Sequence, residues 1–260
     1  MGHHDHVSLL VTDVLPALVS HLRSADGQGR WRLERHPESA PVALEIRFES
    51  VPDVLGELEQ RVQHAAARLG LSVEVSRTGA DGSGVSAALS ELASELALKV
   101  LGGGPLDRAE QVSTAALHLR LLTELTPPGN RPAFLFLNWQ HWSRTLGPAL
   151  RVELHEQAEK LAPALLAGTV ETARDHRHRP AWTEYGRALR TTVADHAAAG
   201  RPALAYELFD HAHHTHLRLG ITVAAEAVAA RALRSALAAA DPADTSTALE
   251  AVLAAAPLAI

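Results

Sequence analysis

The sequence of 260 residues contains no cysteine. This absence excludes disulfide bonds, thiolate nucleophiles, and zinc or iron–sulfur sites that use cysteine ligands. Lysine is scarce as well: Lys99 and Lys160 are the only two, so almost every basic side chain is an arginine. A reaction that runs through a lysine Schiff base therefore has only two candidate residues.

Long apolar runs are also missing, because none reaches the roughly 18 residues that a membrane span needs. The opening residues MGHHDHVSLLVTD lack the positive charge of a signal peptide, and their histidines are either native or introduced. We therefore expect a cytoplasmic protein without a membrane partner. The formal net charge of −6, with no long basic run, argues against nucleic-acid binding.

The common motifs of nucleotide binding and hydrolysis do not occur. The sequence has no Gly-x-Gly-x-x-Gly, no P-loop, no Gly-x-Ser-x-Gly and no HExxH. Six of its 16 histidines lie in two clusters, at His176–His178 and His211–His216. In the second cluster Asp210 and His214 form one ligand-like pair. Because no metal-site motif surrounds them, we expect no metal ion and no cofactor.

The first 77 residues alternate between strand and helix signals. Val42–Phe48, for example, alternates apolar with polar or small residues, as a half-buried strand does. The predicted strands are Val7–Thr12, Trp31–His36, Val42–Phe48 and Leu71–Ser76, and the predicted helices are Asp13–Ser24 and Ser50–Leu69. This βαββαβ order is that of a ferredoxin-like unit.

A Gly- and Ser-containing linker at 78–84 separates this part from an almost wholly helical remainder. The predicted helices are Val85–Leu101, Asp107–Leu125, Pro132–Leu146, Leu150–Leu166, Ala181–Ala199, Ala203–Leu219, Val223–Ala240 and a tail near Thr245–Ala255. The predicted fold class is therefore α+β, with a ferredoxin-like unit over residues 1–77 and a helical bundle over 85–260. We expect the two parts to form one compact catalytic unit.

Two stretches are more specific than their composition. They are Phe134–Leu150, which reads FLFLNWQHWSRTLGPAL, and Leu208–Ala229, which reads LFDHAHHTHLRLGITVAAEAVA. In the N-terminal part, Trp31 and Arg35 lie on one predicted strand and Ala43–Phe48, ALEIRF, on the next. These strand motifs, followed along the chain by the second stretch, resemble the lantibiotic dehydratase C-terminal domain family. That family has a Trp/Arg strand, a strand similar to His-Leu-Arg-Leu-Arg-Phe, and a His-Met-His-x-Asn-Arg-Leu-Gly helix followed by a Glu-containing helix. The resemblance extends over nearly the whole chain.

The resemblance implies an enzyme of peptide maturation, a lyase or cyclase that acts on the leader and core of a modified precursor peptide. Some free-standing members eliminate glutamate from glutamylated Ser or Thr. Others are pyridine synthases of thiopeptide biosynthesis, which join two dehydroalanines in a formal aza-[4+2] cycloaddition with loss of water and of the leader. Other biosynthetic enzymes are candidate partners.

The departures from the family pattern favour the pyridine synthases. Elimination expels a glutamate carboxylate, and clustered arginines suit that task because guanidinium groups bind carboxylates bidentately. Here Glu45 stands where the first strand arginine is expected, and Ala43 stands where the histidine is expected. A glutamate at that position would repel a glutamyl carboxylate.

The candidate catalytic residues are His213, Tyr185 and Tyr206. His213 aligns with the family's histidine five residues before the arginine, and histidine suits general acid–base catalysis; a packed helix histidine is the alternative. The two tyrosines could donate and accept protons on an iminol, or pack in the core. The candidate substrate-binding residues are Arg35, Arg47, Arg218 and Gln140.

Three functional hypotheses stay open. The first is a pyridine synthase without a cofactor, with its leader bound along the sheet. The second is a glutamate-elimination subunit that works with a separate glutamylating partner. The third is a non-catalytic leader-binding protein that keeps the fold and lacks the chemistry.

Overall fold

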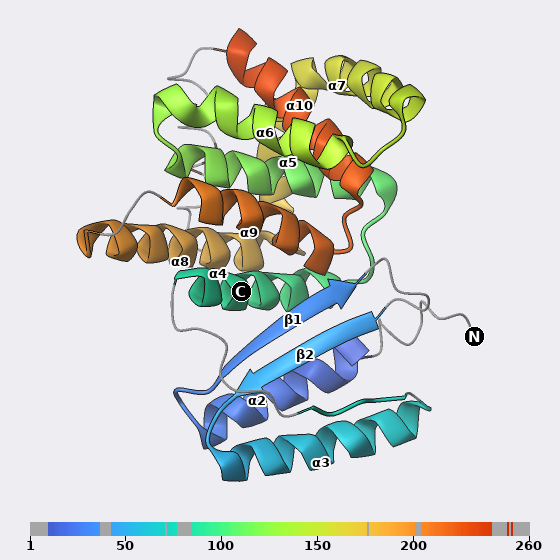
Figure 1. Cartoon of the computed structure of the whole chain (residues 1–260), viewed down its shortest axis with the longest axis vertical. Helices are drawn as coiled ribbons and strands as arrows, with labels where there is room; N and C mark the ends of the chain where they lie inside the picture. The colour runs from blue at the N-terminus through green and yellow to red at the C-terminus, as the bar shows by residue number, and fades with distance from the viewer. Residues whose placement is uncertain are drawn as a thin grey trace. The chain divides into compact units, whose positions relative to one another are not determined.

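The computed structural model describes residues 10–36, 43–70, 72–76, 85–175, 177–200 and 204–240, together with 249 and 251. The chain divides into two compact units, Met1–Pro105 and Leu106–Ile260. Figure 1 labels their helices and strands. No helix in the described part of the chain is both long enough and apolar enough to cross a membrane.

The N-terminal unit is built around a β-hairpin. Its elements are η1 (Leu10–Val14), α2 (Leu15–Ala25), β1 (Arg30–His36), β2 (Ala43–Glu49), α3 (Pro52–Leu69) and α4 (Val85–Leu101). The strands pair antiparallel, with Trp31 opposite Phe48 and Leu33 opposite Ile46. Because side chains alternate along a strand, these apolar residues share one face of the hairpin.

Helix α4 closes the free edge of β1. The Leu33 backbone N–H donates to Ser94 Oγ over 2.9 Å. The Trp31 indole N–H donates to Glu95 Oε1 over 2.6 Å. A strand edge left bare would present unpaired backbone groups, so this helix protects the hairpin from pairing with another chain.

Two of the four predicted strands form. β1 confirms Trp31–His36, and β2 confirms Val42–Phe48 from Ala43 onward; Val42 lies outside the described residues. The first predicted strand is wrong over Leu10–Thr12, which lie in the π-helix η1. Buried Val11 there continues the helical spacing of α2, where Leu15, Leu18 and Leu22 are buried.

The last predicted strand, Leu71–Ser76, is not formed over its described residues 72–76. Val73 and Val75 are both exposed there, so this segment has no buried face that would hold it in a sheet. The sheet of the described residues therefore has two strands. The α+β class holds, whereas the four-stranded ferredoxin-like unit is not confirmed.

The C-terminal unit is helical. Its elements are α5 (Arg108–Leu125), η2 (Pro128–Asn130), α6 (Arg131–Ser143), α7 (Pro148–Arg174), α8 (Arg179–Ala198), α9 (Ala205–Arg218) and α10 (Val223–Ala239). Each of these α-helices had been predicted, with shifts of a few residues at most ends. The exception is α7, which continues past the predicted end at Leu166. The predicted tail helix lies almost entirely outside the described residues.

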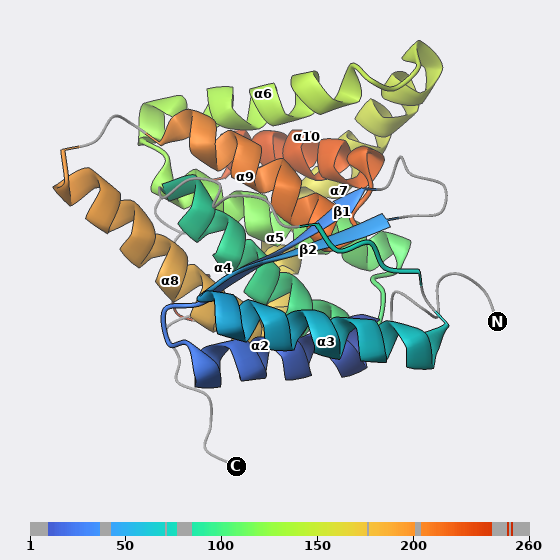
Figure 2. The same ribbon diagram turned by 60° about the horizontal axis from the view of Figure 1, so that its bottom comes forward.

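Helices α5 and α10 form the centre of this unit. α10 packs against α5, α6 and α7, and Figure 2 shows α10 beside α6. Its buried alanines, among them Ala229 and Ala232, let neighbouring helices approach closely. α5 is buried on every side, which is typical of a central helix. It also carries two buried polar residues, His118 and Arg120.

A tight turn joins α9 to α10. Gly220 has φ 74°, a left-handed conformation that glycine adopts without strain. Its N–H donates to Leu217 O, and the Ile221 N–H donates to His216 O, the two bonds of a Schellman motif. Thr222 then caps α10 through its side chain. The Arg-Leu-Gly motif therefore ends one helix and places Glu226 in the first turn of the next.

This geometry predicts opposite effects of alanine at two glycines of the same unit. Gly220→Ala should lower the free energy of unfolding by about 1–2 kcal/mol, because alanine resists positive φ. Gly168→Ala, in α7 with open space around its Cα, should raise it by about 0.5–1 kcal/mol. Urea unfolding measures both, and equal effects would contradict the assigned turn.

Candidate functional site

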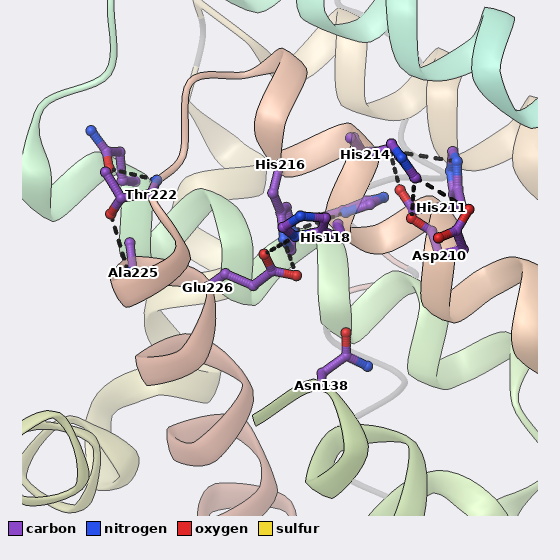
Figure 3. A network of polar contacts seen from close by, with 12 residues as sticks. His118, Asn138, Asp210, His211, His214, His216, Thr222, Ala225 and Glu226 are labelled. Carbon is purple, nitrogen blue, oxygen red and sulfur yellow. Dashed lines mark hydrogen bonds and ion pairs between the residues drawn. The ribbon is translucent and has the colours of Figure 1, made fainter. Parts of the chain in front are cut away.

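The C-terminal unit buries a connected set of polar side chains from four helices, part of which is drawn in Figure 3. Buried titratable groups are costly unless they are paired, so such a set indicates a built site rather than ordinary core. The set comprises His118 from α5, Tyr185 from α8, His211, His213 and His216 from α9, and Glu226 from α10.

Glu226 lies between two histidines of α9. His213 Nδ1 is 2.8 Å from Glu226 Oε2. His216 Nδ1 is 3.1 Å from Oε1, an ion-pair distance at which the N–H is not well aligned for a hydrogen bond. The glutamate side chain is 1% exposed. One carboxylate therefore holds two imidazoles, and Figure 3 shows it directed toward His216 and His118.

This arrangement keeps Glu226 ionised. Burial raises the pKa of the carboxyl group, but the nearby His216 imidazole and the hydrogen bond from His213 outweigh burial. The net effect is a pKa well below the usual value for glutamate. At neutral pH the group is thus a buried anion that can only accept hydrogen bonds.

A chain of short contacts leads away from this pair. His216 Nε2 is 3.1 Å from His118 Nδ1. The Tyr185 hydroxyl lies between His118 Nε2 and His211 Nε2, at 2.7 Å from each. Both hydrogen-bonding functions of the Tyr185 hydroxyl are therefore occupied by protein groups.

The groups of this series that do not contact Glu226, namely His118, Tyr185 and His211, are uncharged at neutral pH. Burial lowers the pKa of His118 well below its ordinary value, and the neighbouring His216 and His211 lower it further. Burial, followed by the charge of Arg218, lowers the pKa of His211 to about 3. Burial raises the pKa of the Tyr185 phenol. These groups consequently exchange hydrogen bonds rather than charge.

Aromatic rings cover His213. The Trp142 ring of α6 stacks on it with centroids 3.4 Å apart and planes 12° from parallel. Trp142 also stacks on Phe209, which lies one helical turn before His213. The His213 side chain remains 11% exposed. Of the two rings that contact Glu226, His213 is therefore the one that reaches the surface, because His216 is fully buried.

Helix α6 brings two unpartnered polar atoms to this region. Asn138 is fully buried, and its Oδ1 has no hydrogen-bond partner in the described part of the chain, nor does the buried Trp142 Nε1. Unsatisfied buried groups are rare in folded proteins and cost free energy, so they often mark functional positions.

The predicted site residues of this unit fall in different environments. His213 and Tyr185 belong to the buried network. Arg218 is buried, and its charge adds to the effect of burial in lowering the pKa of His211. At Tyr185 the same charge offsets part of the rise in pKa that burial causes. Tyr206 is 76% exposed, and Gln140 is exposed on α6. The structure thus brings His213, Tyr185 and Arg218 together and leaves the other two on the surface.

Arg35 and Arg47 belong to the N-terminal unit. Arg47 pairs with Arg32 across the hairpin, whereas Arg35 pairs with Leu44, so the two candidate arginines lie on opposite faces. Arg47 donates to Glu45 on its own strand. Burial lowers the pKa of Arg35. The hairpin therefore does not gather them into one guanidinium cluster.

Among the described residues, one group of three side chains has metal-ligand spacing, Glu34, His36 and Glu45. The Glu45 carboxylate already accepts from Arg47 and contacts His36 Nε2 at 3.2 Å, so the group is internally paired. His214, part of the ligand-like pair in the sequence, contacts its partner Asp210 directly at 3.3 Å on the surface. Neither group carries a metal assignment.

Four members of the network were not among the predicted site residues. His118 sits in an apolar helix, and only its isolation in an otherwise fully buried pattern could have drawn attention to it. His216 and His211 share the histidine-rich α9 with His213, and Glu226 follows the Arg-Leu-Gly turn. Their spacing gave a signal, but it could not show which side chains face inward.

A scan against protein-family models and a search of curated proteins find no match. Two solved structures share the fold. The tRNA dependent lantibiotic dehydratase MibB from Microbispora sp. 107891 aligns with a TM-score of 0.60 and 18% identity, over 89% of this chain and 26% of that one. TsrL aligns with a TM-score of 0.63 and 15% identity, over 99% and 97%.

The chain thus spans about a quarter of the dehydratase and nearly all of TsrL. At these identities the likeness shows the fold. At that level it agrees with the family resemblance in the sequence, because one of the two structures is a lantibiotic dehydratase. The pyridine synthase branch remains a proposal.

The buried neutral histidines predict a specific loss of stability in acid. A histidine whose pKa is lower in the folded state than in the unfolded state binds fewer protons when the protein is folded. The free energy of unfolding therefore falls as the pH drops below about 6.5. For His211 this continues toward about 3. Each such histidine contributes a slope of about 1 kcal/mol per pH unit between pH 6 and 4.5.

Urea unfolding of the wild type and of His211→Gln at several pH values isolates this contribution. In the variant, the slope of the free energy of unfolding against pH should be smaller by about 1 kcal/mol per pH unit, whatever the stability of the variant at neutral pH. His64→Gln, at an exposed position of α3, is the control and should keep the wild-type slope. An unchanged slope in His211→Gln would show that the buried ring is protonated in the folded state.

Proposed function

We propose that the chain is a thiopeptide pyridine synthase, which joins two dehydroalanines of a ribosomal peptide and releases the leader. The observation that carries this proposal is the His213–Glu226 pair. It presents one oriented imidazole at the edge of a buried network, within a fold shared with a lantibiotic dehydratase and with TsrL. The enzyme would need no cofactor for this chemistry.

The reaction requires proton transfers that an oriented imidazole can perform. An amide proton moves from nitrogen to oxygen to give an iminol, the azadiene. Bonds then form between the two β-carbons, and between the iminol carbon and the second α-carbon. The hydroxyl leaves as water and the leader as a carboxamide, with one proton lost from each β-carbon. The Nε2 of His213 would accept and return these protons.

Glu226 suits this role. Because its carboxylate accepts from Nδ1 of His213, the neutral ring carries its lone pair on Nε2 and is a base there. Once protonated, the imidazolium is stabilised by the same carboxylate. Proximity of the two dehydroalanines would supply most of the remaining rate enhancement.

The unpartnered atoms of α6 favour a peptide substrate. Asn138 Oδ1 is an acceptor and Trp142 Nε1–H a donor, one helical turn apart on the same face. A peptide amide offers the complementary N–H and C=O. Since both atoms are buried, binding must displace the side chains that cover them.

Glu45 supports cycloaddition over elimination. It accepts a hydrogen bond from Arg47 and lies close to His36, so this face of the hairpin already holds a carboxylate against its basic groups. A glutamyl carboxylate would meet repulsion there. The second candidate remains a glutamate-elimination subunit, which the fold shared with a tRNA dependent dehydratase favours. The third is a leader-binding protein without chemistry.

Intact-mass spectrometry separates the three functions. The protein is incubated with the precursor peptide encoded beside its gene, in dehydrated and in glutamylated form. The proposal predicts release of the leader carboxamide and a core lighter by one water, from the dehydrated peptide alone. Loss of glutamate from the glutamylated peptide would establish elimination instead. Leader binding without any change of mass would establish the non-catalytic alternative.

His213→Gln should slow the reaction by about 10²- to 10⁴-fold, the usual contribution of a general acid–base group. His214→Gln changes the neighbouring, exposed histidine of the same helix and should keep wild-type turnover. Circular dichroism and thermal melts should show both variants folded. Wild-type turnover by folded His213→Gln would remove His213 from the mechanism.

A further inference from the structure

The ionised Glu226 fixes the direction of the hydrogen bonds around it. A carboxylate accepts only, so the nitrogens that face it, Nδ1 of His213 and Nδ1 of His216, must both carry hydrogen. The opposite tautomer of His216 would point a ring lone pair at the carboxylate. That contact would be repulsive and would turn the carboxylate away from its place under His213.

The remaining hydrogen bonds of this series then all run in one direction. With His216 neutral, its Nε2 accepts from His118 Nδ1–H. The Nε2 of His118 in turn accepts from the Tyr185 hydroxyl. The Tyr185 oxygen is left to accept from His211 Nε2–H. Every donor in this series points toward Glu226, and each ring is held in one tautomer by its neighbour.

We propose that Tyr185 and His118 are positioning residues, which act through His216 and Glu226 to hold the proton of His213 on Nδ1 and leave Nε2 as its proton acceptor. This assignment rests on the proposed function for its catalytic meaning. It differs from the role that the sequence predicts for Tyr185, in which the phenol itself touches the substrate.

The burial of these residues favours the positioning role. Tyr185 is 4% exposed and His118 is fully buried. The phenol oxygen already donates to one histidine and accepts from another, so no hydrogen-bonding function is left for a peptide. His118 touches Trp182, Tyr185, His211 and His216 at ring centroid distances of 5.0–6.3 Å, which fixes the plane of its ring.

Tyr185→Phe is the sharpest test, because it removes the hydroxyl and keeps the ring. Long-range ¹⁵N NMR spectra of histidine separate protonated from bare ring nitrogens in the free protein. In the wild type, His213 and His216 should each show a protonated Nδ1 and a bare Nε2. In Tyr185→Phe, His216 should shift toward a mixture of tautomers, and kcat should fall on the order of tenfold with KM unchanged.

Tyr206→Phe is the matched control, since it deletes the same hydroxyl from the exposed tyrosine and should match the wild type in both measurements. His118→Asn tests the same proposal at the next link and should also disturb His216. An unchanged His216 spectrum in Tyr185→Phe overturns the positioning role, even if turnover falls. A His216 that is doubly protonated in the wild type would also overturn the positioning role.

The NMR measurement needs no peptide, so it stands apart from the proposed function. A protein that leaves every peptide unchanged, yet shows the predicted tautomers, would keep the hydrogen-bond chain and lose the pyridine synthase assignment. A protein that releases the leader, yet keeps its His216 spectrum in Tyr185→Phe, would keep the pyridine synthase assignment and lose the positioning role of Tyr185.

Discussion

The contact between one buried carboxylate and two histidines governs the C-terminal unit. Glu226 is removed from water, and the unit can bury it as an anion only because His213 and His216 face its two oxygens. Replacing either ring by a side chain without a hydrogen-bond donor would leave a buried charge with half its partners, a strongly destabilising change. The same few atoms therefore determine the stability of the unit and its proposed chemistry, and the ring that we propose as reactive is the one that reaches the surface.

The fold supplies the geometry for this contact. The Schellman turn at Gly220 reverses the chain between α9 and α10, so residues 13 positions apart face each other. The centrally placed α5 then contributes His118 from 98 residues earlier in the chain. The stacked Trp142 of α6 fixes the His213 ring from the other side. Four helices thus position one imidazole, and the rigidity of their packing suits the acid–base role that we propose for it.

The parts of this structure that depend on local sequence pattern are predictable from the sequence. Apolar periodicity located the helices of the C-terminal unit and two strands, and the Arg-Leu-Gly motif led to His213. Prediction from local pattern failed where tertiary packing decides the structure of a segment. Val11 looked like part of a strand because its run is short, yet it continues the buried stripe of α2. His118 gave no signal, because its partners are distant in sequence and only the folded chain joins them.

The ionisation of Glu226 tests this account most directly. Side-chain ¹³C NMR of glutamate-labelled protein, assigned by comparison with Glu226→Gln, follows this one carboxyl group through a pH titration. The account predicts that its resonance stays at the ionised position from pH 7 down to pH 4, because the two histidines lower its pKa. A carboxyl group that takes up a proton between pH 5 and 7 would contradict it, since a protonated Glu226 could neither hold both rings nor stabilise a charged His213.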